Sequence, residues 1–138
     1  NTVLWFFGSG KLKHQMEESS KKLPVVFWGD KSPDKMPDFL NCTNLLLLPS
    51  KNEGLPLVLV EALNCGCKAV GSNVGGIKEI IGAENVVNYP SNDFVEKFAE
   101  KVIYRLSSNE QTAEFETNDD FSWEHAKLIE DSDIKRFI

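Results

Sequence analysis

The stretch from Leu45 to Gly76 reads LLLLPSKNEGLPLVLVEALNCGCKAVGSNVGG, and it decides the fold. It begins with a short apolar run that Pro49 closes, which is typical of a strand buried on both faces. A polar turn follows, and Pro56 then fits the first position of a helix, because its missing N–H would be unpaired there anyway. Gly66 suits the left-handed cap after that helix. The pattern therefore predicts a strand, a loop and a helix, in that order.

A second unit of the same kind follows directly. Lys68–Gly71 reads as another buried strand, and Asn73–Gly76 reads as a loop that opens another helix. Each unit presents unpaired amides of a helix N-terminus at the end of a strand. Ligands of open parallel sheets bind at such strand ends, and helix N-termini favour anions. The sequence thus predicts an anion-binding site along this edge of a parallel sheet.

Two carboxylates indicate which kind of anion binds there. Glu53 lies in the loop before the first helix, and Glu61 lies within that helix. The helix rises only ~7.5 Å from Pro56 to Glu61, so both carboxylates can line one elongated cleft. Carboxylates accept hydrogen bonds from vicinal sugar hydroxyls, and the amides of Leu57 and Val58 between them can hold phosphate. The resulting order, sugar–phosphate–sugar, is the layout of a nucleotide-sugar.

The motif PSKNEGLPLVLVEALNCGCKAVGSNVGGIKEII, residues 49–81, resembles the signature of retaining GT-B glycosyltransferases of family 4. These enzymes act in the synthesis of bacterial polysaccharide, capsule and lipopolysaccharide. Two glutamates separated by seven residues are the hallmark of the family, and here they are Glu53 and Glu61. The resemblance extends from about Val3 through this motif and returns at residues 121–123. It implies an α/β fold, namely a Rossmann-like parallel sheet with helices on both faces, as in the C-terminal half of a GT-B fold.

The resemblance also implies roles for individual residues. Glu53 is expected to be catalytic by contacting the transferred sugar, and Glu61 is expected to hold the ribose hydroxyls of the donor. The other donor-binding residues that it implies are Gly8, Gly29, Asp30, Gly54, Leu55, Pro56, Leu57, Val58, Gly75 and Gly76. It implies no metal and no cofactor, since the nucleotide-sugar, linked to UDP or GDP, is the substrate.

The resemblance covers the C-terminal domain of such an enzyme, so residues 1–138 are expected to be one truncated donor-binding domain. The resemblance implies that the first strand of that domain, the Arg and Lys that clamp the diphosphate, and the N-terminal acceptor domain are expected outside this chain, so that alone it is expected to be inactive. The expected partners are the nucleotide-sugar donor and the acceptor domain. Further hypotheses are a cytoplasmic location, peripheral membrane association through the acceptor domain, and self-association through a patch near Trp5, Trp123 and Phe137.

Two alternative functions stay open at this point. A sugar-nucleotide epimerase resembling the UDP-N-acetylglucosamine 2-epimerases would also bind a nucleotide-sugar, although Gly54-Leu55-Pro56 within this glutamate spacing fits the transferases better. A non-catalytic binding domain could retain the same fold. For Glu61 alone, the plain interpretation is a carboxylate that only reaches solvent or pairs with a lysine.

Composition argues against several other classes of protein. The 138 residues are 41% hydrophobic and 26% charged, which is ordinary for a soluble globular chain. The net charge of −6 argues against nucleic acid as the main partner, because binding it requires clustered Lys and Arg. Cys42, Cys65 and Cys67 lack the second Cys or His pair of a zinc site, so we expect reduced, buried thiols.

The rest of the chain alternates strands and helices, which predicts a single five-stranded parallel sheet. The expected strands are Val3–Phe7, Val25–Trp28, Leu45–Leu48, Lys68–Gly71 and Val86–Tyr89. Shorter helices are expected over residues 11–22, with Leu12 and Met16 inward, over residues 34–42 and over residues 77–81.

The longest expected helix begins after a cap within residues 91–93. Its apolar residues recur at helical spacing and predict a stripe in the core. They are Phe94, Val95, Phe98, Val102, Ile103 and Leu106. A final helix is expected to begin at Ser122, which would be its N-cap.

Overall fold

The fold is that of a computed structural model, which describes residues 2–108. The expectations for the helix at Ser122 and for Trp123 and Phe137 lie outside these residues. The chain divides into two compact units, residues 1–39 and residues 40–138. Each unit is built around its own parallel sheet.

The first unit contains a two-stranded parallel sheet. Strand β1 (Leu4–Phe7) pairs with β2 (Val25–Gly29), and helix α1 (Lys13–Ser20) connects them. After β2 come a 3-10 turn, η1 (Pro33–Lys35), and helix α2 (Met36–Leu40), which runs across the boundary of the units.

Aromatic side chains pack together on the sheet of the first unit. Phe39 of α2 packs against Trp5, Phe7 and Trp28, with ring centroids 5.1 to 6.2 Å apart. Leu12 was expected inward but is 65% exposed, which corrects that prediction. Helix α1 begins only at Lys13, so Leu12 occupies the N-cap position and lies outside the repeating helical face.

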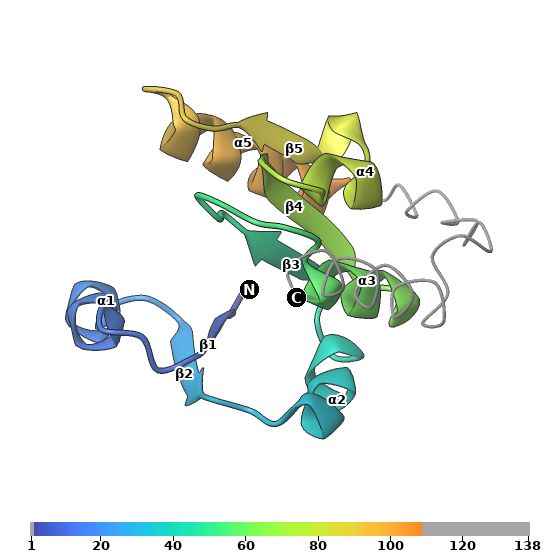
Figure 1. The fold of residues 1–138 in the computed structure, drawn as a ribbon. Helices are drawn as coiled ribbons and strands as arrows, with labels where there is room; N and C mark the ends of the chain where they lie inside the picture. The colour runs from blue at the N-terminus through green and yellow to red at the C-terminus, as the bar shows by residue number, and fades with distance from the viewer. Residues whose placement is uncertain (1, 109–138) are drawn as a thin grey trace, which may run out of the picture. The chain divides into compact units, whose positions relative to one another are not determined.

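The second unit contains a three-stranded parallel sheet in the order β3-β4-β5 (Figure 1). Its strands are β3 (Leu45–Leu48), β4 (Lys68–Asn73) and β5 (Val86–Asn88). Helix α3 (Leu57–Asn64) connects the first pair of strands. Helix α4 (Ile77–Ile81) and the short turn η2 (Ala83–Asn85) connect the second pair, and helix α5 (Phe94–Ser107) follows.

The two faces of this sheet bury two separate sets of apolar side chains, because side chains alternate along a strand. Leu46, Leu48 and Ala69 pack with Leu59 of α3 and with α4. From the opposite face, Leu45, Leu47, Val70 and Val87 pack against α5, where Phe98 is buried. Helices therefore cover both faces of a parallel sheet, and the expected α/β, Rossmann-like class is confirmed.

The expected five strands are present and their pairings are parallel, but they form two sheets and not one. Among the described residues, β1 forms its ladder hydrogen bonds with β2 alone, and β3 forms its own with β4 alone. Each sheet is therefore closed within its own set of strands, and no described strand bridges the two.

Only part of the expected apolar stripe on α5 reaches the core. Phe98 is buried and Phe94 and Val102 pack beside it, whereas Val95 and Ile103 are exposed, as is Leu106. At 100° per residue, Ile103 lies roughly 140° around the helix from Phe98, so a single sheet face cannot bury both. The stripe is thus narrower than the sequence pattern predicted.

Candidate functional site

The loops that follow β3 and β4 lie against each other, and Gly75 makes this approach feasible. A Cβ at Gly75 would lie 2.0 Å from the carbonyl oxygen of Glu53, and the residue has φ +52. Both conditions favour glycine, because other residues rarely adopt positive φ. The amide of Gly76 then donates to the carbonyl oxygen of Gly54 at 2.8 Å. Four of the expected site residues, Glu53, Gly54, Gly75 and Gly76, are therefore brought together.

Two serines that sequence reasoning missed connect these same loops. Ser72 is fully buried in β4, and its hydroxyl donates to the carbonyl oxygen of Ser50. The hydroxyl of Ser50 in turn donates to Oε1 of Glu53 at 2.6 Å. Ser72 is the second-last residue of β4, one position beyond the expected strand end at Gly71. A buried hydroxyl needs a hydrogen-bond partner, so a serine directly after the apolar run was the signal that could have indicated this contact.

The N-terminus of α3 lies directly after the Glu53 loop. Pro56 has φ −76 and ψ 100, so it is the extended N-cap residue, and the helix begins at Leu57. Pro56 was expected at the first helical position, but it lies one residue before it. Within the described part of the chain, no side chain caps α3. The free amides of its first turn, which includes Leu57 and Val58, thus remain able to bind an anion.

Glu61 lies one helical turn after Leu57 on α3 and is half-buried. The neighbouring positions Leu59 and Ala62 point into the core, which leaves Glu61 at the border of the buried face. This placement is compatible with the expected contact to ribose. The role of Glu61 stays a prediction.

The expected site residues of the first unit also lie together. Gly8 follows β1 and Gly29 ends β2, both with positive φ, and the amide of Gly8 donates to the carbonyl oxygen of Gly29 at 2.9 Å. The hydroxyl of Ser9 donates to the carboxylate of Asp30. Gly8, Gly29 and Asp30 therefore share the carboxyl end of that sheet. That they line one cleft with Glu53 remains a prediction.

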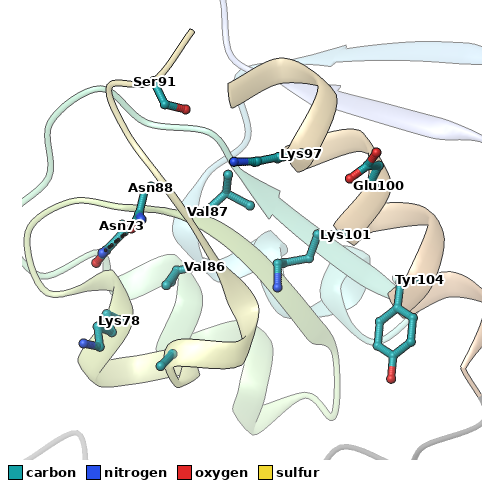
Figure 2. Close-up of a pocket in the computed structure, with 11 residues that line it drawn as sticks. Asn73, Lys78, Val86, Val87, Asn88, Ser91, Lys97, Glu100, Lys101 and Tyr104 are labelled. Atoms are coloured by element: carbon teal, nitrogen blue, oxygen red, sulfur yellow. Dashed lines mark hydrogen bonds between the residues drawn. The ribbon is translucent and has the colours of Figure 1, made fainter. Parts of the chain in front are cut away.

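A pocket of about 670 Å³ lies elsewhere on the second unit, and the sequence did not indicate it. Figure 2 shows Lys97 and Lys101 on α5, together with the hydrogen-bonded pair Asn73 and Asn88 at the ends of β4 and β5. Both lysines already have partners. Lys97 forms an ion pair with Asp93 at 2.6 Å, and Lys101 donates to the carbonyl oxygen of Glu84.

The ion pair at this pocket alters two ionisation equilibria. The hydrogen bond from Lys97 lowers the pKa of Asp93, and the same contact raises the pKa of Lys97. Both groups are thereby held in their charged forms. None of the expected site residues lines this pocket, so it is not the predicted donor cleft.

The cysteines are all free thiols, and Cys67 is buried while Cys65 is half-buried. The expectation of buried thiols is wrong for Cys42, which is exposed in the turn after α2. Burial raises the pKa of Cys67 to about 11. Among residues 2–108, no group of three or more His, Cys, Asp or Glu side chains is placed to hold a metal ion. In the same residues, no helix is both long and apolar enough to cross a membrane.

Comparison with known proteins places the chain in a family. The family model of group 1 glycosyl transferases matches residues 1–108, which is most of the chain. The chain therefore belongs to the group 1 glycosyl transferases, a family of transferases.

Individual relatives agree with this assignment. The chain is 32% identical over 128 residues to an uncharacterized glycosyltransferase of Methanocaldococcus jannaschii, covering 85% of this chain and 36% of that protein. It is 33% identical over 76 residues to the sulfoquinovosyl transferase SQD2 of Arabidopsis thaliana, covering 55% of this chain and 15% of that protein. The chain thus spans about a third or less of the length of these relatives.

A solved structure shows the same fold. The crystal structure of a GtfA/B complex matches 80% of this chain with a TM-score of 0.63, at 24% identity and over 24% of the matched chain. At this identity the likeness bears on the fold alone.

Proposed function

We propose that the chain is the donor-binding part of a retaining GT-B glycosyltransferase of the family 4 type. It binds a nucleotide-sugar, and the complete enzyme transfers the sugar to a glycan or a lipid-linked acceptor in the synthesis of polysaccharide, capsule or lipopolysaccharide. The observation that carries this proposal is the placement of Glu53 in the loop after β3, directly before the uncapped N-terminus of α3.

The proposal assigns the diphosphate of the donor to the first turn of α3. Negative charge builds on the leaving oxygen as the bond to the sugar breaks, and donors fixed in place stabilise it without reorganisation. The amides near Leu57 and Val58 are such donors, because their positions are set by the helix. Glu61 then holds the ribose hydroxyls and Glu53 contacts the transferred sugar.

The names of relatives support the class of reaction. A serotype-specific mannosyltransferase of Escherichia coli is 33% identical over 66 residues, covering 48% of this chain and 8% of that protein. The proposal includes an acceptor-binding domain as the partner that completes the active site. It includes a cytoplasmic reaction, with peripheral membrane association through the acceptor domain, and no requirement for a metal ion.

The experiment is turnover of a panel of UDP-, GDP- and ADP-sugars by the complete enzyme, with and without a chelator of divalent cations. We expect release of the nucleoside diphosphate from one class of donor, and a glycosylated product that retains the anomeric configuration of the donor sugar. Release of a free sugar epimer instead would support the alternative of a sugar-nucleotide epimerase. Failure to bind any of the donors would overturn the proposal.

A further inference from the structure

The predicted catalytic carboxylate has a defined hydrogen-bond donor within its own loop. The hydroxyl of Ser50 donates to Oε1 of Glu53 at 2.6 Å, three residues away along the chain. Both residues are half-buried, so the bond is partly shielded from water. A hydrogen bond to an ionised acceptor is about twice as strong as one between neutral groups. This contact therefore restricts the rotamers that the Glu53 side chain adopts.

The backbone that carries Ser50 is itself fixed from the sheet. Ser72 has 0% exposure, and its hydroxyl donates to the carbonyl oxygen of Ser50. Residue 72 lies in β4, whose neighbours β3 and β5 pair with it on both sides. The position of Ser50 is thus set by the most enclosed strand of the second unit, and not by the loop alone.

The other end of the loop is held by the glycines after β4. The amide of Gly76 donates to the carbonyl oxygen of Gly54, and Gly75 allows the backbone of Glu53 to approach closely. The loop is therefore held on both sides of Glu53. Ser72 binds the backbone of Ser50, which precedes Glu53, and Gly76 binds the backbone of Gly54, which follows it. What remains adjustable is the side chain of Glu53, which Ser50 engages.

We propose that Ser50 and Ser72 are positioning residues for sugar transfer. Ser72 fixes the Ser50 backbone, and the Ser50 hydroxyl orients the Glu53 carboxylate toward the transferred sugar. This inference rests on the proposed role of Glu53, and it adds two residues to which that proposal gives no function. Neither serine needs to contact the donor.

The first test is a double-mutant cycle in the complete enzyme, with steady-state kinetics at varied donor concentration. We expect Ser50→Ala to lower kcat about ten- to a hundredfold with little change in donor KM, because a hydrogen bond to a charged group is lost. Ser50→Thr keeps a hydroxyl and should recover much of the rate. In a Glu53→Ala background, Ser50→Ala should cause no further loss, since it acts only through Glu53.

Ser91→Ala is the matched control. The hydroxyl of Ser91 also donates to a carboxylate two residues away, that of Asp93, in an exposed turn of the same unit. This substitution should leave kcat and KM unchanged. If Ser50→Ala and Glu53→Ala instead act additively, or if Ser50→Ala changes KM alone, the positioning role is wrong while the proposed transferase function stands.

The second test does not depend on activity. The carboxyl carbons of glutamate are labelled with 13C in the 138-residue chain, and the Glu53 resonance is followed by NMR. Ser50→Ala and Ser72→Ala should both shift this resonance, whereas Ser91→Ala should not. An unmoved resonance in both serine variants overturns the inference. If the resonance shifts but the complete enzyme turns over no donor, the hydrogen bond exists but serves no sugar transfer. That outcome also overturns the inference.

Discussion

At the scale of single residues, hydrogen bonds and the absence of one Cβ define the candidate site. Gly75 allows the loops after β3 and β4 to touch. Hydrogen bonds of Ser72 and Ser50 connect the sheet to the carboxylate of Glu53. These residues perform different tasks. Glycine permits close approach of two backbones, whereas the serines satisfy buried polar groups and orient a charge.

The two glutamates should give different kinetic effects when removed from the complete enzyme. Glu61→Ala should mainly weaken donor binding, because the ribose that it holds does not change during the reaction. The loss of one charged hydrogen bond corresponds to roughly 1.5–3 kcal/mol, or about ten- to a hundredfold in affinity. Glu53→Ala should mainly lower kcat, because contacts that strengthen in the transition state appear there.

Steady-state kinetics with the donor varied distinguish these expectations, and Val95→Ala on the exposed face of α5 is the control. Full turnover by Glu53→Ala would remove that residue from the mechanism. Equal effects on KM alone in both variants would make both glutamates binding residues.

The buried thiol of Cys67 should make stability fall at alkaline pH. Its pKa rises from 9.0 to about 11 in the folded chain, mainly because burial disfavours the thiolate. Above about pH 9 the unfolded chain loses this proton while the folded chain keeps it, so the free energy of unfolding decreases as pH approaches 11. Urea unfolding of the chain between pH 8 and pH 10.5 measures this decrease.

Cys67→Ala removes this contribution, and comparison of the two chains cancels the other groups that titrate in the same range. The variant is expected to be less stable near neutral pH, because a buried side chain is truncated, but to show a shallower decline above pH 9. Parallel profiles for the two chains would show that Cys67 ionises as readily in the folded state as in the unfolded state.

At the scale of elements, α5 shows how a sheet selects one face of a helix. The sequence offers six apolar residues at approximately helical spacing, yet the sheet face of β4 and β5 buries Phe98 and leaves Val95 exposed. A helix presents only one stripe to a flat layer, so the residues on either side of the stripe stay in solvent. The helix nevertheless packs against side chains from all three strands of the sheet.

The packing of α5 predicts a large contrast between two of its positions. Phe98→Ala should reduce the free energy of unfolding by about 3–5 kcal/mol, because it leaves a cavity next to Val70 and Val87. Val95 is 80% exposed, so Val95→Ala should change the free energy of unfolding by no more than about 0.5 kcal/mol. Urea denaturation of both variants tests this, and similar losses in the two would contradict the face assignment.

At the scale of the whole chain, the residues expected to bind the donor are distributed over both units. Gly8, Gly29 and Asp30 belong to the first unit, and Glu53 and Glu61 belong to the second. Gly8, Gly29 and Asp30 lie at the carboxyl ends of β1 and β2, Glu53 lies in the loop after β3, and Glu61 lies in the helix that follows this loop. This distribution agrees with the rule that open α/β sheets bind ligands at those ends.

A nucleotide that binds the folded chain should raise its unfolding temperature. Ligand at a hundredfold excess over its Kd contributes about 2.7 kcal/mol to stability, provided that it does not bind the unfolded chain. We expect UDP or GDP to raise the midpoint of thermal unfolding of the chain, and Glu61→Ala to reduce that shift at equal nucleotide concentration. Inorganic pyrophosphate, which lacks a ribose, is the control and should act equally on both chains. The same shift for wild type and Glu61→Ala would argue against a ribose contact.

The sequence by itself determined the order of strands and helices, the α/β class and the positions of the strand-end loops. Apolar runs such as Leu45–Leu48 and glycines such as Gly66 carry this information locally, because strand burial and helix capping depend on a few neighbouring residues. The expected positions of Glu53 in a loop and Glu61 in a helix followed from the same local signals.

Only the tertiary structure decided which residues meet. The division of five strands into two sheets, the narrow buried stripe of α5 and the contact of Ser72 with Ser50 all involve partners far apart in the sequence. Such contacts depend on how layers pack and on which backbone groups lack a partner, and no local pattern encodes either. For this reason the sequence indicated the carboxylate of Glu53, while the structure alone identified the hydroxyls that orient it.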